Sequence, residues 1–140
     1  RSCGWNLLLN SNLKIRRGKD SLVIVGEQNL ERPDSACFTK AMQGVGAHAF
    51  AIILQHNPKA WEKYIVNDSR ARLTLCGHTH GGQLSLFGLR PTQIEYRQDY
   101  GLYQKGKQYL FISSGLGGLI PFRLGISPEI AVITLHKTKP

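Results

Sequence analysis

Three histidines that follow two apolar segments are the residues best suited to chemistry. Residues 49–54 lead to His56, and residues 72–76 lead to His78 and His80. In open α/β sheets, ligands bind beyond the carboxyl ends of the strands, so two neighbouring strand ends would bring the three imidazoles together. Neutral imidazole is a common ligand of Zn, Mn and Fe in proteins. We therefore interpret His56, His78 and His80 as candidate metal ligands.

The surroundings of His78 and His80 favour metal ligation over an ordinary structural role. Residues 77–83 read GHTHGGQ, so one threonine separates the two histidines and glycines flank them. In an extended segment both rings would point to the same side, and the glycines allow a close approach of metal or substrate. His48 and His136 have no such surroundings, and we interpret them as ordinary loop or core residues.

Other catalytic patterns are absent from the sequence. A hydrolytic two-metal site needs carboxylates that hold both ions, yet the sequence contains neither Asp-x-His nor Gly-Asp. Gly-x-Ser-x-Gly is also absent, and nothing pairs a base with Ser113 or Ser114. The glycine-rich residues 115–118 lack the lysine and the spacing of a phosphate-binding loop, so we interpret them as a turn. We assign no catalytic residue within this chain.

Length and composition indicate one globular domain over residues 1–140. The chain is 41% hydrophobic and 19% charged, as in ordinary soluble proteins. It contains no run of about eighteen apolar residues and no signal-peptide pattern. It begins at Arg1 and not at Met, so we expect a processed product or an excised piece. Three cysteines without Cys-x-x-Cys spacing do not resemble a disulfide framework or a zinc ribbon.

The charge balance suggests an anionic partner. Eighteen Lys and Arg residues against nine Asp and Glu give a formal net charge of +9. These cations are scattered, with their densest group at residues 14–19, and no basic helix or aromatic-interleaved motif accompanies them. No specific nucleic acid is therefore expected. A basic, non-catalytic module that binds nucleic acid or an anionic membrane surface remains the alternative to an enzyme.

Hydrophobic periodicity and turn residues predict a mixed α/β fold, with β-sheets flanked by helices. Two helices are predicted, at residues 36–43 and 59–66, the second of them capped by Asn57. A loop is predicted at residues 115–125. The predicted strands are residues 13–15 and 22–25, which form a hairpin, and residues 49–54, 72–76, 84–87, 108–113 and 129–135.

The GHTHGGQ segment resembles the last metal motif of the calcineurin-like metallophosphoesterases. It looks most like a bacterial subfamily of membrane-associated or exported phosphohydrolases. Residues 53–58 are similar to the preceding histidine motif of that family, and residues 113–130 contain segments similar to its C-terminal part. The resemblance covers nearly all of the chain. It implies the C-terminal half of a two-layer β-sandwich flanked by helices, and a protein that is membrane-associated or exported in bacteria.

The resemblance also implies a dinuclear centre with two divalent metal ions, Mn, Fe or Zn. His56 and His78 would ligate one metal and His80 the other, and the metals would activate the nucleophile that attacks phosphorus. Gln83 and Arg123 would reach the phosphate or head group of the substrate. That substrate would be a phosphomonoester, a phosphodiester, or a lipid- or nucleotide-linked pyrophosphate.

One departure from the family pattern is large. The earlier motifs of the family, Asp-x-His, Gly-Asp and Gly-Asn-His-Asp/Glu, do not occur. The chain therefore looks like the C-terminal half of the enzyme, and its partner would be the missing N-terminal half, which carries the carboxylate ligands. We expect the chain alone to bind metal weakly, if at all, and to have negligible activity. A mononuclear zinc hydrolase that uses only the three histidines is a further hypothesis.

Overall fold

Four parallel strands form the centre of the protein. A computed structural model describes residues 3–29 and 32–137, and within them one six-stranded sheet has the order β1-β2-β3-β4-β6-β5. Strands β2, β3, β4 and β6 run parallel, whereas β1 and β5 pair antiparallel at the two edges. The strands are β1 Ser11–Arg17, β2 Asp20–Gly26, β3 Ala51–Leu54, β4 Ala71–Cys76, β5 Gly101–Lys105 and β6 Gln108–Ile112. The predicted α/β class is confirmed.

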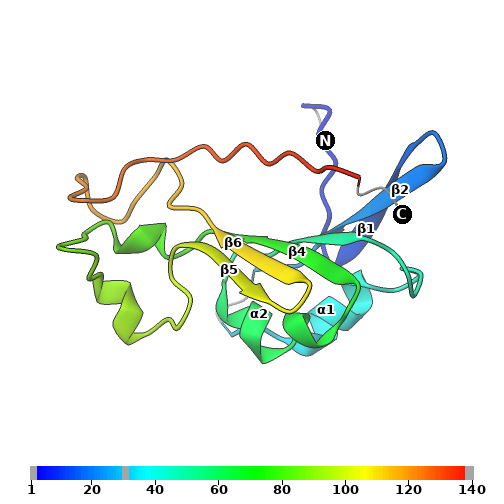
Figure 1. The fold of residues 1–140 in the computed structure, drawn as a ribbon, viewed down its shortest axis with the longest axis horizontal. Coiled ribbons are helices and arrows are strands. Elements are labelled where there is room, and N and C mark those ends of the chain that lie inside the picture. The colour runs from blue at the N-terminus through cyan, green and yellow to red at the C-terminus, as the bar shows by residue number, and fades with distance from the viewer. Residues whose placement is uncertain (1–2, 30–31, 138–140) are drawn as a thin grey trace.

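Two helices cover one face of the sheet. Helix α1 spans Ser35–Ala41 and α2 spans Lys59–Lys63, and Figure 1 shows both on the same side of the strands. Phe38 of α1 and Trp61 of α2 belong to the core cluster, together with Ile53 of β3 and Leu110 of β6. Alternate residues of the strands face this core, because side chains in a strand point alternately to its two sides. Among the helices of the described residues, none is long and apolar enough to cross a bilayer.

Side chains on the opposite face of the sheet are also apolar but less covered. We call this surface the open face. The pairing register places eleven of its residues side by side: Leu13, Ile15, Leu22, Ile24, Ile52, Leu54, Leu73, Leu75, Leu102, Tyr109 and Phe111. Ile52 and Leu73 at its centre are buried, whereas Leu13, Leu54 and Tyr109 are exposed.

Both predicted helices occur, with shifted ends. Asp34 Oδ1 accepts a hydrogen bond of 2.9 Å from the Ala36 amide, and Asn57 Oδ1 accepts one of 3.0 Å from the Lys59 amide. These side chains satisfy amides that a helix start leaves unpaired. The second helix is shorter than the predicted 59–66, because Tyr64 at φ −151° leaves the helical region before a 3-10 turn at Ile65–Asn67.

Two predicted strands are wrong, and one strand was not predicted. Residues 84–87 form no strand but only two isolated bridges, and Phe87 and Gly88 with positive φ turn the chain there. Residues 129–135 have no regular structure. Strand β5 was not predicted, although it pairs with β6 across a turn that contains Gly106 at φ 61°. The hairpin and the strands at residues 49–54, 72–76 and 108–113 are confirmed, with small shifts of their ends.

Candidate metal centre

The parallel strands bring the histidine loops to the same edge of the sheet. Leu54 near the end of β3 pairs with Leu75 near the end of β4, so His56 and His78 leave neighbouring strands at the same level. The Gly77 amide also donates a hydrogen bond of 3.2 Å to the His56 carbonyl oxygen. This bond continues the contact between β3 and β4 beyond the strands, and the two histidine loops start side by side.

The rings of His56 and His78 lie against each other. Their centroids are 4.9 Å apart and the rings meet edge to face at 78°. Burial lowers the pKa of both imidazoles from the ordinary value, and neighbouring histidines lower it further. A lowered pKa favours the neutral imidazole, which is the form that binds a metal.

Tyr96 also contacts His78. Its hydroxyl lies 2.7 Å from His78 Nε2 and shares a hydrogen bond with it. The ammonium group of Lys59 lies 4.4 Å from the centre of the Tyr96 ring, and its nitrogen is 2.6 Å from a carboxyl oxygen of Glu95. Tyr96 therefore orients the ring of His78, a role that sequence reasoning missed because Tyr96 lies in an irregular segment eighteen residues away.

His80 lies near the pair but not in an extended segment. The extended backbone predicted for the His-Thr-His tripeptide is wrong, since φ is 72° at His78 and 53° at His80, and His80 starts a 3-10 turn. A charge on His80 would lower the pKa of both His56 and His78, but among the described residues the three histidines do not form a group that could hold an ion. Non-glycine residues with positive φ are strained, and such strain is concentrated at functional sites.

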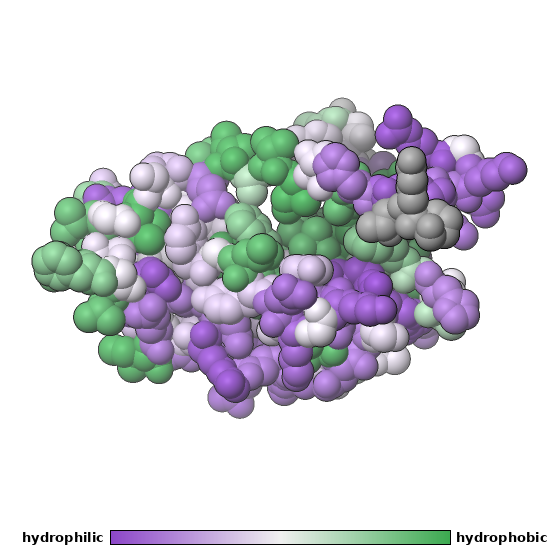
Figure 2. All heavy atoms as spheres, viewed as in Figure 1, coloured by the Kyte–Doolittle hydropathy of each residue, from purple (hydrophilic) through white to green (hydrophobic). Residues whose placement is uncertain are grey.

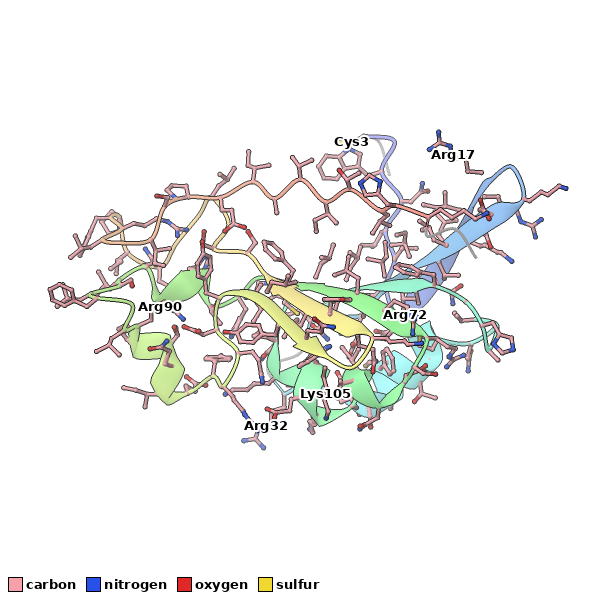
Figure 3. All side chains as sticks on the ribbon, in the orientation of Figure 1. Cys3, Arg17, Arg32, Arg72, Arg90 and Lys105 are labelled. Atoms are coloured by element: carbon pink, nitrogen blue, oxygen red, sulfur yellow. The ribbon has the colours of Figure 1, made fainter. Side chains whose placement is uncertain are left out.

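A buried ion pair anchors the His-Thr-His turn. The hydroxyl of Thr79 donates a hydrogen bond of 2.5 Å to the main-chain oxygen of Asp99. The Asp99 carboxylate is almost fully buried and accepts bonds from Arg90 Nε at 2.7 Å and Nη2 at 2.9 Å. Thr92 donates a further bond of 2.8 Å to this carboxylate. Asp99 thus ties the histidine turn to the loop that carries Arg90, which is labelled in Figure 3.

Gln83 and Arg123 hold two loops together. The buried amide of Gln83 donates to the carbonyls of Ile120 at 2.9 Å and Phe122 at 3.0 Å. Arg123 donates to the carbonyls of His80 at 3.3 Å and Ser114 at 2.9 Å. These contacts hold the glycine-rich loop that follows β6 beside the His-Thr-His turn, in agreement with the interpretation of residues 115–118 as a turn. Binding of substrate by Gln83 or Arg123 stays a prediction.

A polar network that sequence reasoning missed lies behind His56. Glu27 follows β2, and its carboxyl accepts a hydrogen bond from the Tyr64 hydroxyl and interacts with the Gln55 side chain. Gln55 Oε1 in turn accepts a bond of 3.2 Å from the Asn57 amide. Burial raises the pKa of Glu27, and its second carboxyl oxygen has no hydrogen-bond partner among the described residues. This network fixes the turn that presents His56.

The donor set fits metal binding in part. The imidazoles suit a transition metal, but among the described residues no three His, Cys, Asp or Glu side chains form a group that could hold an ion. The charge of the Glu95 carboxylate raises the pKa of His78. That carboxylate already forms an ion pair, because Lys59 Nζ lies 2.6 Å from Glu95 Oε1. A dinuclear centre would need carboxylates in addition to the histidines described here.

Comparison with known proteins finds bacterial relatives named as phosphoesterases. The chain is 37% identical to the phosphodiesterase YaeI of Escherichia coli over 138 residues, which are 96% of this chain and 49% of that protein. It is 40% identical over 93 residues to the uncharacterized metallophosphoesterase YkuE of Bacillus subtilis, which are 64% of this chain and 32% of YkuE. An uncharacterized metallophosphoesterase of Aquifex aeolicus is 28% identical over 142 residues, 96% of this chain and 52% of that protein.

This chain spans about half of the length of the E. coli and A. aeolicus proteins. No family model matches the sequence, and no solved structure matches it.

The ion pair between Asp99 and Arg90 yields the first prediction. Asp99→Asn removes the partner of a largely buried guanidinium and should lower the free energy of unfolding by about 3 kcal/mol. Burial alone would raise the pKa of Asp99, but hydrogen bonds from Arg90 and Thr92 outweigh it, so the pKa is lowered. This contribution to stability is present above the unfolded-state pKa and is lost as pH falls through the folded-state pKa. Urea unfolding at several pH values measures both effects.

The matched control for this prediction is Asp20→Asn. Asp20 also forms an ion pair, with Lys137 at 2.7 Å, but both side chains are mostly exposed. Exposed pairs contribute little because water and salt screen them, so this variant should leave the unfolding midpoint nearly unchanged. Equal effects of the two substitutions would contradict the anchoring role of Asp99.

The Glu27 network yields the second prediction. Glu27→Ala leaves the Tyr64 hydroxyl and the Gln55 amide without their partner and should cost about 1–3 kcal/mol of stability. The pKa of Glu27 is raised in the folded state, so ionisation of its buried carboxyl destabilises the fold. This destabilisation grows as pH rises from the unfolded-state pKa of Glu27 to its folded-state pKa. Glu27→Gln should remove this pH dependence and be at least as stable as the parent at neutral pH, because a neutral amide avoids the cost of burying a charge. Urea unfolding at pH 5 and pH 8 tests this, and a Gln variant as unstable as the Ala variant would contradict it.

Proposed function

Because this chain belongs to the calcineurin-like metallophosphoesterase family, we propose that it forms part of a metal-dependent phosphoester hydrolase. In this proposal His56, His78 and His80 are metal ligands of the catalytic centre. The observation that carries the proposal is the approach of His56 and His78, whose rings lie 4.9 Å apart at the carboxyl edge of a parallel sheet.

Several contacts of the chain support metal binding at this edge. The main-chain hydrogen bond from Gly77 to His56 sets the spacing of the two loops. The Tyr96 hydroxyl holds the His78 ring by a hydrogen bond at His78 Nε2. A metal-binding histidine commonly has such a partner on its other nitrogen, so Tyr96 would leave His78 Nδ1 for the metal. Thr79 and Asp99 fix the turn between His78 and His80. These residues hold the ligands in place before any metal arrives.

The bound metals, Mn, Fe or Zn, would supply an activated water and would neutralise the charge that develops on the phosphoryl group. The first substrate class to test is a phosphodiester, because the E. coli relative is named a phosphodiesterase. Phosphomonoesters and lipid- or nucleotide-linked pyrophosphates are the next classes. The surplus of nine positive charges in this chain would attract any of these anions.

We further propose that this chain is inactive by itself. The three histidines lack the carboxylates that a dinuclear centre requires, and the chain spans about half of the length of its relatives. The remaining ligands would come from polypeptide that corresponds to the unmatched part of those relatives.

Hydrolysis of bis-p-nitrophenyl phosphate tests the proposal. The product of the complete reading frame that encodes this chain should hydrolyse it with Mn, Fe or Zn, whereas the 140-residue chain should show no turnover. His78→Ala and His80→Ala should each lower kcat/KM by at least about 100-fold, because a metal ligand is lost.

His48→Ala is the control, since His48 is exposed and lies in the turn before β3, at the opposite end of that strand from His56. It should leave kcat/KM unchanged. Full activity of the His78 and His80 variants, or robust turnover by the 140-residue chain, would contradict the proposal.

A further inference from the structure

A charged groove lies between helix α2 and the segment at residues 95–98, which follows the 3-10 turn Pro91–Ile94. We call it the polar groove. Its volume of about 330 Å³ is within the usual range for sites that bind small molecules. In Figure 2 hydrophilic side chains gather on the lower side of the molecule, the side on which Figure 1 shows α1 and α2. The walls of the groove carry three cations, two carboxylates and one aromatic ring, from Lys59, Lys63, Arg97, Glu62, Glu95 and Tyr96.

Two ion pairs join the walls of the polar groove. Lys59 Nζ lies 2.6 Å from Glu95 Oε1, and Arg97 Nη1 lies 2.6 Å from Glu62 Oε1. Each pair connects α2 with residues 95–98. All four side chains are at least 42% exposed, so the pairs contribute little to stability and their charged groups stay accessible to a ligand.

Tyr96 connects the polar groove to the candidate metal centre. Its ring lies 4.4 Å from Lys59 Nζ, and its hydroxyl lies 2.7 Å from His78 Nε2. Lys59 is also only three residues from His56 along the chain. A ligand that occupies both sites would therefore place one part against Lys59 and another part at the histidines.

Lys59 has the hydrogen-bond donors that a further anion needs. An ammonium group has three donors, and among the described residues Glu95 accepts from only one of them. Arg90 is less suited, because two of its nitrogens donate to the buried Asp99 carboxylate. Arg123 already donates to main-chain oxygens of two loops. Lys59 can therefore bind an anion without breaking a contact that holds these loops.

We propose that the polar groove is a subsite for a second phosphate group of the substrate, and that Lys59 binds this phosphate. The inference rests on the proposed function, since the reacting phosphoester would lie at the histidines. The groove has three cations against two carboxylates, so its charge favours an anion. Hydrogen bonds from an ammonium group to phosphate are charge-assisted and strong. The substrate class would be a phosphoester that carries a phosphate in addition to the one that reacts.

Phosphate binding by the 140-residue chain without metal is the first test. Inorganic phosphate is added at constant ionic strength while the amide chemical shifts are followed by NMR. The amides of residues 95–98 should shift in a saturable manner. Lys59→Gln should weaken this binding at least about fivefold, because a charge-assisted hydrogen bond is lost.

Lys137→Gln is the matched control. Lys137 also forms an exposed ion pair, with Asp20 at 2.7 Å, and it does not line the polar groove. Both substitutions remove one positive charge, so an effect of net charge alone would be equal in the two variants. Lys137→Gln should leave the affinity for phosphate nearly unchanged, and neither variant should change Tm noticeably.

Kinetics of the product of the complete reading frame are the second test. The substrates are the p-nitrophenyl esters of thymidine 5′-phosphate with and without a 3′-phosphate, which release the same leaving group. Lys59→Gln should raise KM about tenfold for the ester with the 3′-phosphate and change kcat little, because it removes binding that ground state and transition state share. KM for the ester without the 3′-phosphate should stay nearly unchanged. Lys137→Gln should change KM for neither ester.

Three results would overturn the inference: no saturable shifts at residues 95–98, equal weakening of phosphate binding by the two substitutions, or equal changes of KM for the two esters in Lys59→Gln. The phosphate titration needs no metal and no turnover. Phosphate binding that depends on Lys59, together with no hydrolysis by the complete product, would refute the proposed function and leave the anion site in place. Hydrolysis by the complete product without such binding would do the reverse.

Discussion

The parallel pairing of β3 with β4 is the constraint on which the candidate site depends. It aligns Leu54 with Leu75, so the two histidine loops begin side by side at the same edge of the sheet. A one-residue shift in this register would turn Ile53 of β3 away from the core cluster, so the packing of that core opposes the shift. Because the core cluster contains Ile53 of β3 and Cys76 of β4, the packing against α1 and α2 also fixes the distance between His56 and His78.

Beyond the strand ends, hydrogen bonds of buried polar side chains hold the loops in place. Asp99 accepts hydrogen bonds from Arg90 and Thr92, and its main-chain oxygen binds Thr79. Behind His56, Glu27 performs a similar role through Gln55. A shift of the loops would break these buried hydrogen bonds, so the two networks restrict the loops to one arrangement. They are what allows strained positive φ angles to persist at His78 and His80.

The elements that could be predicted from sequence are those with a local signal. The apolar run before His56 identifies β3, and the capping residue Asn57 identifies the start of α2. Strand β5 is short, begins with Gly101 and ends with Gln104 and Lys105, so only its pairing with β6 reveals it. The approach of His56 to His78 could be predicted from the positions at which their strands end. Tyr96 and Asp99 lie in irregular segments, and no sequence pattern predicts their contacts with His78 and Thr79.

The failed strand prediction at residues 129–135 has a different cause. Its run of apolar residues is a real strand signal, but a strand forms only when another strand satisfies its main-chain groups, and among the described residues no strand pairs with it. The histidine cluster shows the same incompleteness, since it has nitrogen ligands without the carboxylates of a dinuclear centre. In both cases the local pattern is present, and what the described residues lack is the partner group that the pattern requires: a neighbouring strand for residues 129–135 and carboxylates for the histidines.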